Sequence, residues 1–451
     1  MKTGSVNYSI NAQKGLRFDA SFHLSEGLLV KRKIASSPYE MLTIKDISSD
    51  IFYGNRAKRV YVSKREKGIP FLSSSDILQA DLENVKLASK KYTPCIEQMT
   101  LEKGWTLISR SGTIGNCAFA NAKHAQKLAS EDVIRLVPNN ILRGGLVYAY
   151  LASSHGHSLL TQGTFGAVIQ HIEPNFIASL PIPKFPDSFQ KEVDGLIQES
   201  ATLREEANDA LEEAHRIIET EFQITSNKKP SRVSINSIRS SHNKRFEAFY
   251  YTSANRSVYD YITSTYEYKT LGELTTNIFR PGIFKREYVA NGVTFLGGAD
   301  ILMAIPDSDK KLSFRQVEKM PELRVKKDWI LVTCGGTIGN TVLIDRQLEQ
   351  CVISQHVMRI VPKEDILKGY LYAVLSSTIG KELITMFSTG SVIPQIEAHH
   401  LELVPIPILE KDVMEHIDSL ITSYVSKIEI SKEKETKAIS MVEQEIEKWN
   451  N

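Results

Sequence analysis

The sequence predicts a mixed α/β protein, in which two similar α/β domains are separated by two long antiparallel helices that form a coiled-coil spacer with pseudo-twofold symmetry. Two observations support this fold class. The chain repeats its own sequence at an offset of 224 residues, and a long apolar stripe at helical spacing follows each copy. Because solenoid repeats are only about 20–50 residues long, an offset of this size indicates a duplicated domain.

The repeated segments occur in the same order in both halves of the chain. The offset stays at 224 from Phe71 to Pro183 and is 228 at the start, where Arg17–Ala20 corresponds to Arg245–Ala248. The matching pairs are Phe71-Leu72 with Phe295-Leu296, Trp105 with Trp329, Gly112–Asn116 with Gly336–Asn340, Val133–Pro138 with Val357–Pro362, and Pro181–Pro183 with Pro405–Pro407. Both copies are therefore expected to share one fold.

Each copy reads as short strands, a tight turn, a helix and an extended exit. The expected elements are a strand ending at Arg110, a partner strand over Asn116–Ala120, a third strand over Asp132–Val137, a helix from Leu146 to Ala152 that is mirrored by Tyr370–Leu375, and an extended segment over Leu180–Pro183. The last segment is extended because a residue that precedes proline is disfavoured in the α conformation. This order of elements predicts an α/β unit.

The turn between the first two strands has the same sequence, Gly-Thr-Ile-Gly-Asn, in both copies. Glycine adopts positive φ without steric cost, so Gly112, Gly115, Gly336 and Gly339 are predicted to be structural turn residues. A residue that specifies a target should differ between two domains that bind different targets. The identity of the two turns therefore favours a structural role over a binding role.

The two apolar stripes predict long helices over residues 187–226 and 409–451, which leaves residues 1–186 and 227–408 as the two α/β domains. The first stripe extends from Val193 to Ile218 and the second from Val413 to Trp449, both at spacings of three and four. Pairing the two helices antiparallel would bury both stripes. Each helix could instead fold back on its own domain, and the polar stretch Ser431–Lys437 weakens the second stripe.

The net charge of +2 conceals an uneven distribution. Residues 189–224 and 410–449 together contain twenty acidic and nine basic side chains, a net charge of −11, which leaves +13 on the rest of the chain. Basic domains can bind the nucleic-acid backbone even when the whole chain is almost neutral. The alternative is that these charges are scattered over solvated surfaces.

Composition and motifs predict a cytoplasmic protein without a catalytic centre. The four cysteines form no CxxC pair, the N-terminus is polar, and no apolar run approaches the ~18 residues of a membrane span. No phosphate-binding or dinucleotide-binding glycine motif and no paired carboxylates with metal-ligand spacing recur in the two copies. We therefore expect no metal and no cofactor bound by this chain, and no role in a membrane.

Basic and aromatic residues that precede Phe71 and Phe295 are the candidate DNA-binding residues. Lys58-Arg59-x-Tyr61 aligns with Lys285-Arg286-x-Tyr288, which places both groups in the same part of the repeat. Arginine and lysine neutralise phosphates, while arginine, asparagine and glutamine read base edges in the major groove. A solvated surface is the alternative. The candidates are Arg56, Lys58, Arg59, Tyr61, Lys64, Arg110, Gln170, Arg280, Lys285, Arg286 and Gln395.

The doubled Gly-Thr-Ile-Gly turns, the Arg17–Ala20 and Arg245–Ala248 openings and the Pro-Ile-Pro exits into acidic helices make the whole chain resemble the specificity subunit of type I restriction–modification systems. The resemblance implies a non-catalytic reader of double-stranded DNA with two target-recognition domains, each reading one half of a bipartite, asymmetric target. Half-sites about one helical turn (~34 Å) or more apart would match a helical spacer. The expected partners are two methyltransferase subunits, which supply S-adenosylmethionine, and restriction/translocase subunits.

Two other functions remain open at this point. One is a self-contained DNA-modifying enzyme whose site is not recognised in the sequence. The other is a coiled-coil adaptor whose duplicated domains bind protein.

Overall fold

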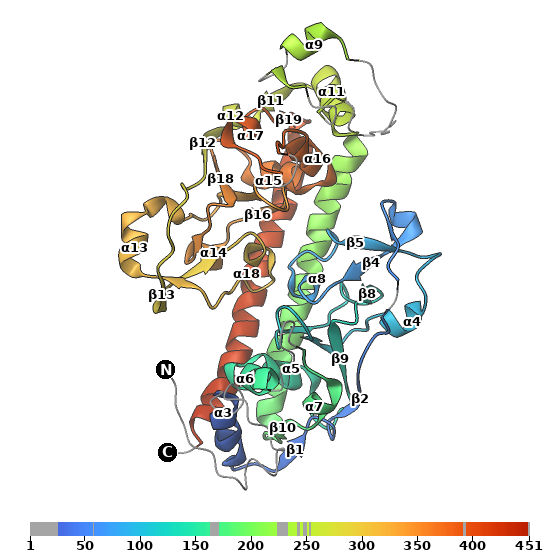
Figure 1. Cartoon of the computed structure of the whole chain (residues 1–451), viewed down its shortest axis with the longest axis vertical. Coiled ribbons are helices and arrows are strands. Elements are labelled where there is room, and N and C mark those ends of the chain that lie inside the picture. Colours follow the sequence, from blue (N-terminus) through green and yellow to red (C-terminus); the bar gives the residue numbers. More distant parts are fainter. Residues whose placement is uncertain are drawn as a thin grey trace. The chain divides into compact units, whose positions relative to one another are not determined.

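The computed structural model describes residues 26–56, 58–162, 171–222, 233–240, 244–246, 250–251, 254–390 and 394–449 (Figure 1). The chain divides into two compact units. Unit 1 contains Met1–Glu205 and Ile430–Asn451, and unit 2 contains Glu206–Glu429. Both boundaries fall inside long helices, α8 (Asp187–Glu221) and α18 (Lys411–Glu447). Each unit therefore contains an α/β part together with a portion of both long helices.

The sheets of unit 1 are small and mostly antiparallel. The main sheet has the order β2-β9-β6-β7, a second has the order β3-β5-β4-β8, and β1 pairs with β10. The strands are β1 (Met41–Thr43), β2 (Ser48–Tyr53), β3 (Tyr61–Val62), β4 (Gly68–Leu72), β5 (Lys86–Ser89), β6 (Thr106–Ser109), β7 (Cys117–Phe119), β8 (Leu128–Ala129), β9 (Val133–Pro138) and β10 (Pro181–Pro183). The helices before α8 are α3 (Glu26–Ala35), α4 (Ile96–Met99), α5 (Gly144–Ala152), α6 (Ser154–Gln162) and α7 (Pro174–Ala178).

The elements expected from the sequence of the first copy are confirmed. Strand β6 pairs with β7 on one side, in the register Ile108 opposite Cys117, and with β9 on the other side. The apolar segment Gly145–Leu151 of α5 is buried on all sides, which is why its sequence has no polar face. The exit Pro181–Pro183 pairs with β1, and proline is tolerated there because the two-stranded ribbon has free edges.

Unit 2 repeats this topology strand for strand in its main sheet, which confirms the duplication. The main sheet has the order β12-β18-β15-β16, and β11 pairs with β19. The strands are β11 (Tyr268–Thr270), β12 (Thr275–Phe279), β13 (Tyr288–Leu296), β14 (Lys311–Leu312), β15 (Ile330–Thr333), β16 (Thr341–Leu343), β17 (Val352–Ile353), β18 (Val357–Pro362) and β19 (Pro405–Pro407). Helices are α9 (Ile235–Ser240), α11 (Ala254–Thr265), α12 (Leu271–Leu274), α13 (Phe314–Lys319), α14 (Arg346–Glu349), α15 (Lys368–Ser376), α16 (Thr378–Met386) and α17 (Ala398–Leu401).

The second sheet differs between the units for a reason that the sequence explains. From Tyr61 to Phe71 the first copy has three more residues than the second has from Tyr288 to Phe295. In unit 1 the extra residues form a 3₁₀ turn, Arg65–Lys67, which separates β3 from β4. In unit 2 the shorter connection leaves one strand, β13, with a register shift between Tyr288 and Val293.

The long helices pair antiparallel, as predicted. In unit 1 the first part of α8 meets the last part of α18, where Ser200 Oγ donates to the Ser431 carbonyl at 2.8 Å. In unit 2 the last part of α8 meets the first part of α18, where Lys427 Nζ lies 2.8 Å from the Glu206 carboxylate. The long helices also contact the α/β parts. The Gly145 amide of α5 donates to Asp194 of α8 at 2.8 Å, and the Gly369 amide of α15 donates to Asp418 of α18 at 2.7 Å. Pairing with each other and folding back on a domain therefore occur together.

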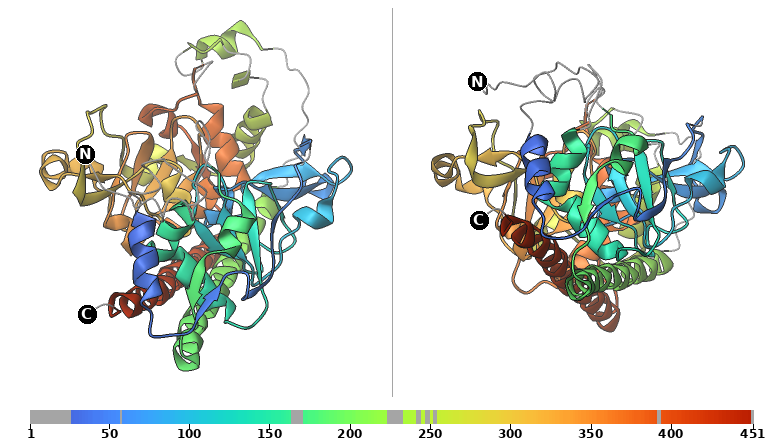
Figure 2. Two further views of the ribbon diagram at one scale, coloured as in Figure 1. Left: turned by 60° about the horizontal axis from the view of Figure 1, so that its bottom comes forward. Right: turned by 90° about the horizontal axis from the view of Figure 1, so that it is seen from below.

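The C-terminal end of α18 is integrated into the core of unit 1. Ala438, Val442, Ile446 and Trp449 belong to the same buried cluster as the apolar residues of α5 and α6. Helix α3 lies against this end of α18 in both views of Figure 2, where Lys33 pairs with Glu447. Unit 1 is thus built from segments at the two ends of the described chain.

Candidate nucleic-acid interface

Each unit has a basic loop at the end of its first main-sheet strand. The first basic loop comprises residues 54–60, between β2 and β3, and the second comprises residues 280–287, between β12 and β13. Both loops begin at an aromatic contact: Phe52 meets Trp105 edge to face at 5.9 Å, and Phe279 meets Trp329 in the same way at 6.0 Å. Such pairs stabilise beyond their buried area, so both loops start from equivalent, fixed positions.

The basic loops also end at equivalent contacts. The Arg59 guanidinium lies 5.2 Å from the centre of the Phe71 ring, and that of Arg286 lies 5.4 Å from the Phe295 ring. Tyr61 contacts Phe71 edge to face at 6.2 Å. Tyr288 makes the same contact with Phe295 at 6.2 Å. The recurring Lys-Arg-x-Tyr pattern is therefore a fixed cation–aromatic anchor in each unit.

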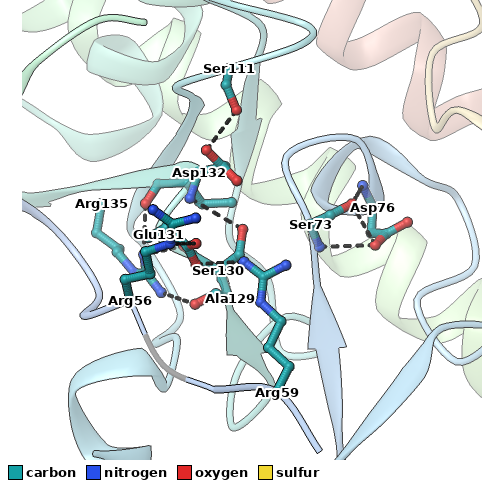
Figure 3. Close-up of polar contacts among 11 residues, drawn as sticks. Arg56, Arg59, Ser73, Asp76, Ser111, Ala129, Ser130, Glu131, Asp132 and Arg135 are labelled. Atoms are coloured by element: carbon teal, nitrogen blue, oxygen red, sulfur yellow. Dashed lines mark hydrogen bonds and ion pairs between the residues drawn. The ribbon is translucent and has the colours of Figure 1, made fainter. Parts of the chain in front are cut away.

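The second partner of each anchoring arginine differs in charge. Arg59 Nη2 lies 2.6 Å from the Glu131 carboxylate, whereas Arg286 Nη2 donates to the Gln355 side-chain carbonyl at 3.3 Å. Burial alone would lower the pKa of Arg59, but the hydrogen bond and charge of Glu131 outweigh it, and the pKa is raised. Figure 3 shows Glu131 between Arg59 and Arg56. The carboxylate neutralises part of the first basic loop, and the amide of Gln355 leaves the charge of Arg286 uncompensated.

A buried arginine in each unit binds the backbone on both sides of Glu131 and of Gln355. Arg135 is fully buried and donates to four carbonyls, those of Met99, Ala129, Ser130 and Val133, at 2.6–3.2 Å. Arg359 makes the equivalent set of bonds to Leu323, Ile353, Ser354 and Val357. Burial lowers the pKa of both arginines to about 10, so both stay charged at neutral pH.

The four carbonyls around each of these arginines form a carbonyl cage, which was not predicted from the sequence as part of a site. The two arginines were seen only as recurring residues of the repeat. The usable signal is a single arginine within an apolar strand, Val-Ile-Arg-Leu-Val in one copy and Val-Met-Arg-Ile-Val in the other. A charge in such a strand is buried, and a buried charge requires a full set of partners.

Arg110 and Arg280 hold equivalent carboxylates from different strands. Arg110 Nη2 lies 2.5 Å from Glu173, and Arg280 Nη2 lies 2.5 Å from Glu397, which is 224 residues further on. Yet the residue 224 beyond Arg110 is Cys334, and Arg280 follows Phe279 as Tyr53 follows Phe52. The arginine therefore follows β6 in unit 1 and β12 in unit 2, which are not equivalent strands, whereas its carboxylate partner occupies the equivalent position in both units.

Each of these carboxylates stands immediately before a short helix, Glu173 before α7 and Glu397 before α17. The Arg110 side chain is only 15% exposed, and its guanidinium also covers the Tyr53 ring at 4.5 Å. The geometry therefore assigns the two arginines a positioning role at these helix starts. Direct contact of Arg110 or Arg280 with DNA stays a prediction.

The remaining candidates lie in different environments. Lys58 and Lys285 are exposed neighbours of the two anchoring arginines, and Lys64 is exposed with Glu66 at 3.9 Å. Gln395 is exposed, and its backbone exchanges two 2.8 Å hydrogen bonds with Thr389. Gln170 lies outside the described residues.

The glycine turns have the backbone that a structural role requires. Gly112 and Gly115 have φ values of +74° and +81°, and Gly336 and Gly339 have +77° and +86°. The Gly115 amide donates to the Ser109 carbonyl at 3.0 Å, and the Gly339 amide donates to the Thr333 carbonyl at the same distance. Next to the first turn, Ser111 Oγ donates to Asp132 at 2.7 Å (Figure 3). Any other residue would be strained at these four positions.

Sequence reasoning missed Ile283, the most exposed large apolar residue among those described. It is 93% exposed and lies in the second basic loop between Gly282 and Phe284. The alignment of Lys58-Arg59-x-Tyr61 with Lys285-Arg286-x-Tyr288 pairs Ile283 with Arg56, whose side chain is 91% exposed. Extending that alignment by two residues towards the N-terminus would have found it.

Searches for other kinds of site gave no candidate within the described parts of the chain. No group of three or more histidine, cysteine or acidic side chains is arranged to hold a metal ion there. No described helix is long and apolar enough to cross a membrane.

Comparison with known proteins gives one family. Residues 243–440 match the model of the type I restriction modification DNA specificity domain. Curated protein sequences give no match.

Solved structures that resemble the chain include the S subunit of a type I restriction–modification system from M. genitalium, at 15% identity and a TM-score of 0.33, covering 91% of this chain and 96% of that one. The HsdS subunit from Thermoanaerobacter tengcongensis matches at 12% identity and a TM-score of 0.29, covering 91% and 97%. A chain from a study of complex assembly and conformational transition of the type I R-M system has the same identity and TM-score, covering 91% and 98%.

Proposed function

The chain belongs to the type I restriction–modification DNA specificity family, through the domain that spans residues 243–440, and on this premise we propose that it selects the DNA sequence on which a type I complex acts. In this proposal, double-stranded DNA is the ligand of both units. Each unit binds one half of a bipartite, asymmetric target, and the chain itself performs no chemistry on the DNA.

The observation that carries this proposal is the pair of basic loops. Each loop is fixed at both ends by the same aromatic and cation–aromatic contacts, at distances that agree within about 0.2 Å between the units. Between the fixed ends, all residues except the lysine before the anchoring arginine differ. Base contacts carry sequence information and phosphate contacts carry register. A shared support with different residues at its tip is what two readers of different half-sites require.

The partners follow from the same family. We propose that two methyltransferase subunits bind the chain and supply S-adenosylmethionine and the transfer of the methyl group. Restriction/translocase subunits would complete the complex. The acidic, solvent-facing sides of α8 and α18, which include Glu192, Glu212 and Glu433, support a role for these helices as docking surfaces for basic faces of partner subunits.

The decisive experiment is co-expression with a type I methyltransferase subunit from the same organism, followed by genome-wide mapping of methylated adenines. We expect one motif composed of two specified halves and an unspecified spacer of fixed length. The methyltransferase expressed without this chain is the control and should leave no such motif. Exchange of the α/β part of unit 1 for that of a related chain should change one half only.

Other outcomes would identify the other functions. Methylation or cleavage of DNA by the purified chain alone would indicate a self-contained enzyme. Binding to the methyltransferase with no affinity for DNA would indicate an adaptor. DNA binding that is insensitive to salt would also contradict the proposal, because phosphate contacts release counterions and make affinity fall steeply with salt.

A further inference from the structure

We propose that the most exposed residue of each basic loop, Arg56 in unit 1 and Ile283 in unit 2, determines which base each unit accepts at an equivalent position of its half-site. This inference rests on the proposed function and names the residues and the base chemistry behind it. Arg56 would require guanine and Ile283 would require thymine.

The two residues hold equivalent sequence positions between equivalent anchor contacts in their own units. Seven positions separate Phe52 from Arg59, and seven separate Phe279 from Arg286. Both ends of each interval make equivalent contacts, on a tryptophan at the start and on a phenylalanine at the end. Loops of equal length between equal anchors present their middle residues at the same place on the unit. Arg56 and Ile283 both stand four positions after the first anchor.

Both side chains are available for a ligand. Arg56 is 91% exposed, and its contact with Glu131, Nε to Oε1, is 3.7 Å, too long for a hydrogen bond. Ile283 is 93% exposed. A single exposed apolar residue is ordinary on a protein surface, but this one lies between Arg280 and Lys285, at the position where the other unit has the exposed guanidinium of Arg56.

The chemistry of the two side chains determines the bases. A guanidinium donates two hydrogen bonds to O6 and N7 of guanine, the commonest specific contact in the major groove. A branched aliphatic side chain makes no hydrogen bond and packs against the C5 methyl group, which only thymine carries. The exposed ammonium groups of Lys58 and Lys285, two residues after each tip, would contact phosphates and fix the register of the loop.

Charge on the neighbouring loop supports the assignment for unit 1. Glu131 lies 2.6 Å from Arg59 and 3.7 Å from Arg56, so this carboxylate pairs more closely with the anchoring arginine than with the exposed Arg56, and Lys58 adds a second exposed cation. In unit 2, where the tip is apolar, the neutral Gln355 leaves Arg286 charged. Each loop thus keeps cations that can contact the phosphate backbone of DNA, whereas the residue at its tip is charged in unit 1 and apolar in unit 2.

The test uses the full chain with its methyltransferase subunits and four variants, Arg56→Gln, Ile283→Arg, Lys58→Gln and Lys285→Gln. Methylome mapping and binding to a set of duplexes with single-base changes are the two measurements. Arg56→Gln should lower the preference for guanine at one position of one half by about 10- to 100-fold. The other half should be unchanged. Ile283→Arg should replace a thymine requirement in the second half by a guanine requirement.

The lysine variants are the matched controls for simple loss of charge. Lys58→Gln and Lys285→Gln should weaken binding to all duplexes alike and reduce the slope of log affinity against log salt by about one. If Arg56→Gln behaves in this way, Arg56 contacts phosphate and the inference is wrong. It is also wrong if the wild-type bipartite motif survives base for base in both tip variants.

Failure of the proposed function looks different, because then the wild-type chain itself gives no bipartite motif. All four positions are exposed, so the variants should unfold at the same urea concentration as the wild type. That measurement shows that a changed motif does not come from a damaged fold.

Discussion

At the residue scale, the buried arginines Arg135 and Arg359 explain how the polar segment before β9 and the equivalent segment before β18 are held in place. Arg135 has no carboxylate partner among the bonds that surround its guanidinium, and four backbone carbonyls accept hydrogen bonds from its Nη1 and Nη2 instead. The segment that supplies three of them, Ala129–Val133, includes Glu131. The planar guanidinium therefore fixes the connection between β8 and β9.

Replacement of Arg135 by methionine should destabilise unit 1 by about 3 kcal/mol or more, because each buried carbonyl left without a donor costs about 1–3 kcal/mol. Arg135→Lys should recover only part of the loss, since an ammonium group cannot donate in a planar fork. Urea unfolding would measure both. Arg143→Met, at a half-exposed salt bridge to Asp187, is the control and should change stability by less than about 0.5 kcal/mol.

His124 gives a pH dependence whose direction follows from its burial. Burial and the nearby charge of Lys127 lower its pKa from the ordinary 6.5 to about 4. The ring stays neutral in the folded state, where Nε2 donates to the Ile77 carbonyl at 3.2 Å and Nδ1 accepts from the Asn121 backbone amide at 3.3 Å. Between pH 6.5 and pH 4 the unfolded chain binds a proton that the folded chain does not bind. Stability is therefore lost as the pH falls through this window.

The contribution of His124 should reach about 3 kcal/mol at pH 4, since one pKa unit corresponds to about 1.4 kcal/mol. The measurement is the difference in unfolding free energy between pH 7 and pH 4.5 in wild type and in His124→Gln. The variant should lose less stability over this interval. Equal losses in the two proteins would contradict a buried neutral histidine. Above pH 7 their stabilities should run parallel.

At the element scale, the polar stretch of α18 forms a buried network. Glu435 accepts a hydrogen bond from the Tyr148 hydroxyl and lies 2.5 Å from Arg204 on α8, with both charged side chains largely buried. Ser200 and Ser431 are buried next to them. These groups all belong to unit 1. A polar network of this kind fixes the register of two helices, because any slip would leave its charges unpaired.

Glu435→Leu should destabilise unit 1 by about 3–5 kcal/mol, because it leaves the buried guanidinium of Arg204 without its carboxylate. The double variant Arg204→Met with Glu435→Leu should recover most of that loss, since an apolar pair of similar size removes both charges. The unfolding free energies of the two single variants and the double variant give the coupling directly. Glu433→Leu, exposed two positions earlier, serves as the control for the helix. Additive losses in the double variant would exclude the network.

At the scale of the whole molecule, unit 1 is discontinuous in sequence. Residues 430–451 are contiguous in the chain with unit 2, yet they complete the core of unit 1, where Ala438, Val442, Ile446 and Trp449 are buried. Stability of the N-terminal α/β part therefore depends on the end of the chain.

Truncation after Glu429 should expose this apolar face and destabilise unit 1 while leaving unit 2 folded. Amide hydrogen exchange would show the difference: protection should fall in α5 and α6 and persist in the β12-β18-β15-β16 sheet. The sheet of unit 2 is the internal control. Retained protection of α5 and α6 would show that unit 1 does not need the C-terminal segment.

The sequence alone determined the duplication, the order of elements in each copy, the glycine turns and the antiparallel helix pair. These features depend on local chemistry: positive φ at glycine, proline at strand ends, and apolar residues at spacings of two or of three and four. The equivalence of Arg59 and Arg286 was also visible, because the aligned residues are identical.

Only the tertiary structure decided what those residues contact. The ion pairs of Arg110 and Arg280 with equivalent carboxylates and the network around Glu435 join residues far apart in sequence. In each carbonyl cage, one bond does the same, that of Arg135 to Met99 and that of Arg359 to Leu323. Their distances are set by packing, which leaves no periodic signal in the chain. The same is true of the two basic loops, where the sequence provided the cations and only the fold decided that Arg56 and Ile283 are more than 90% exposed.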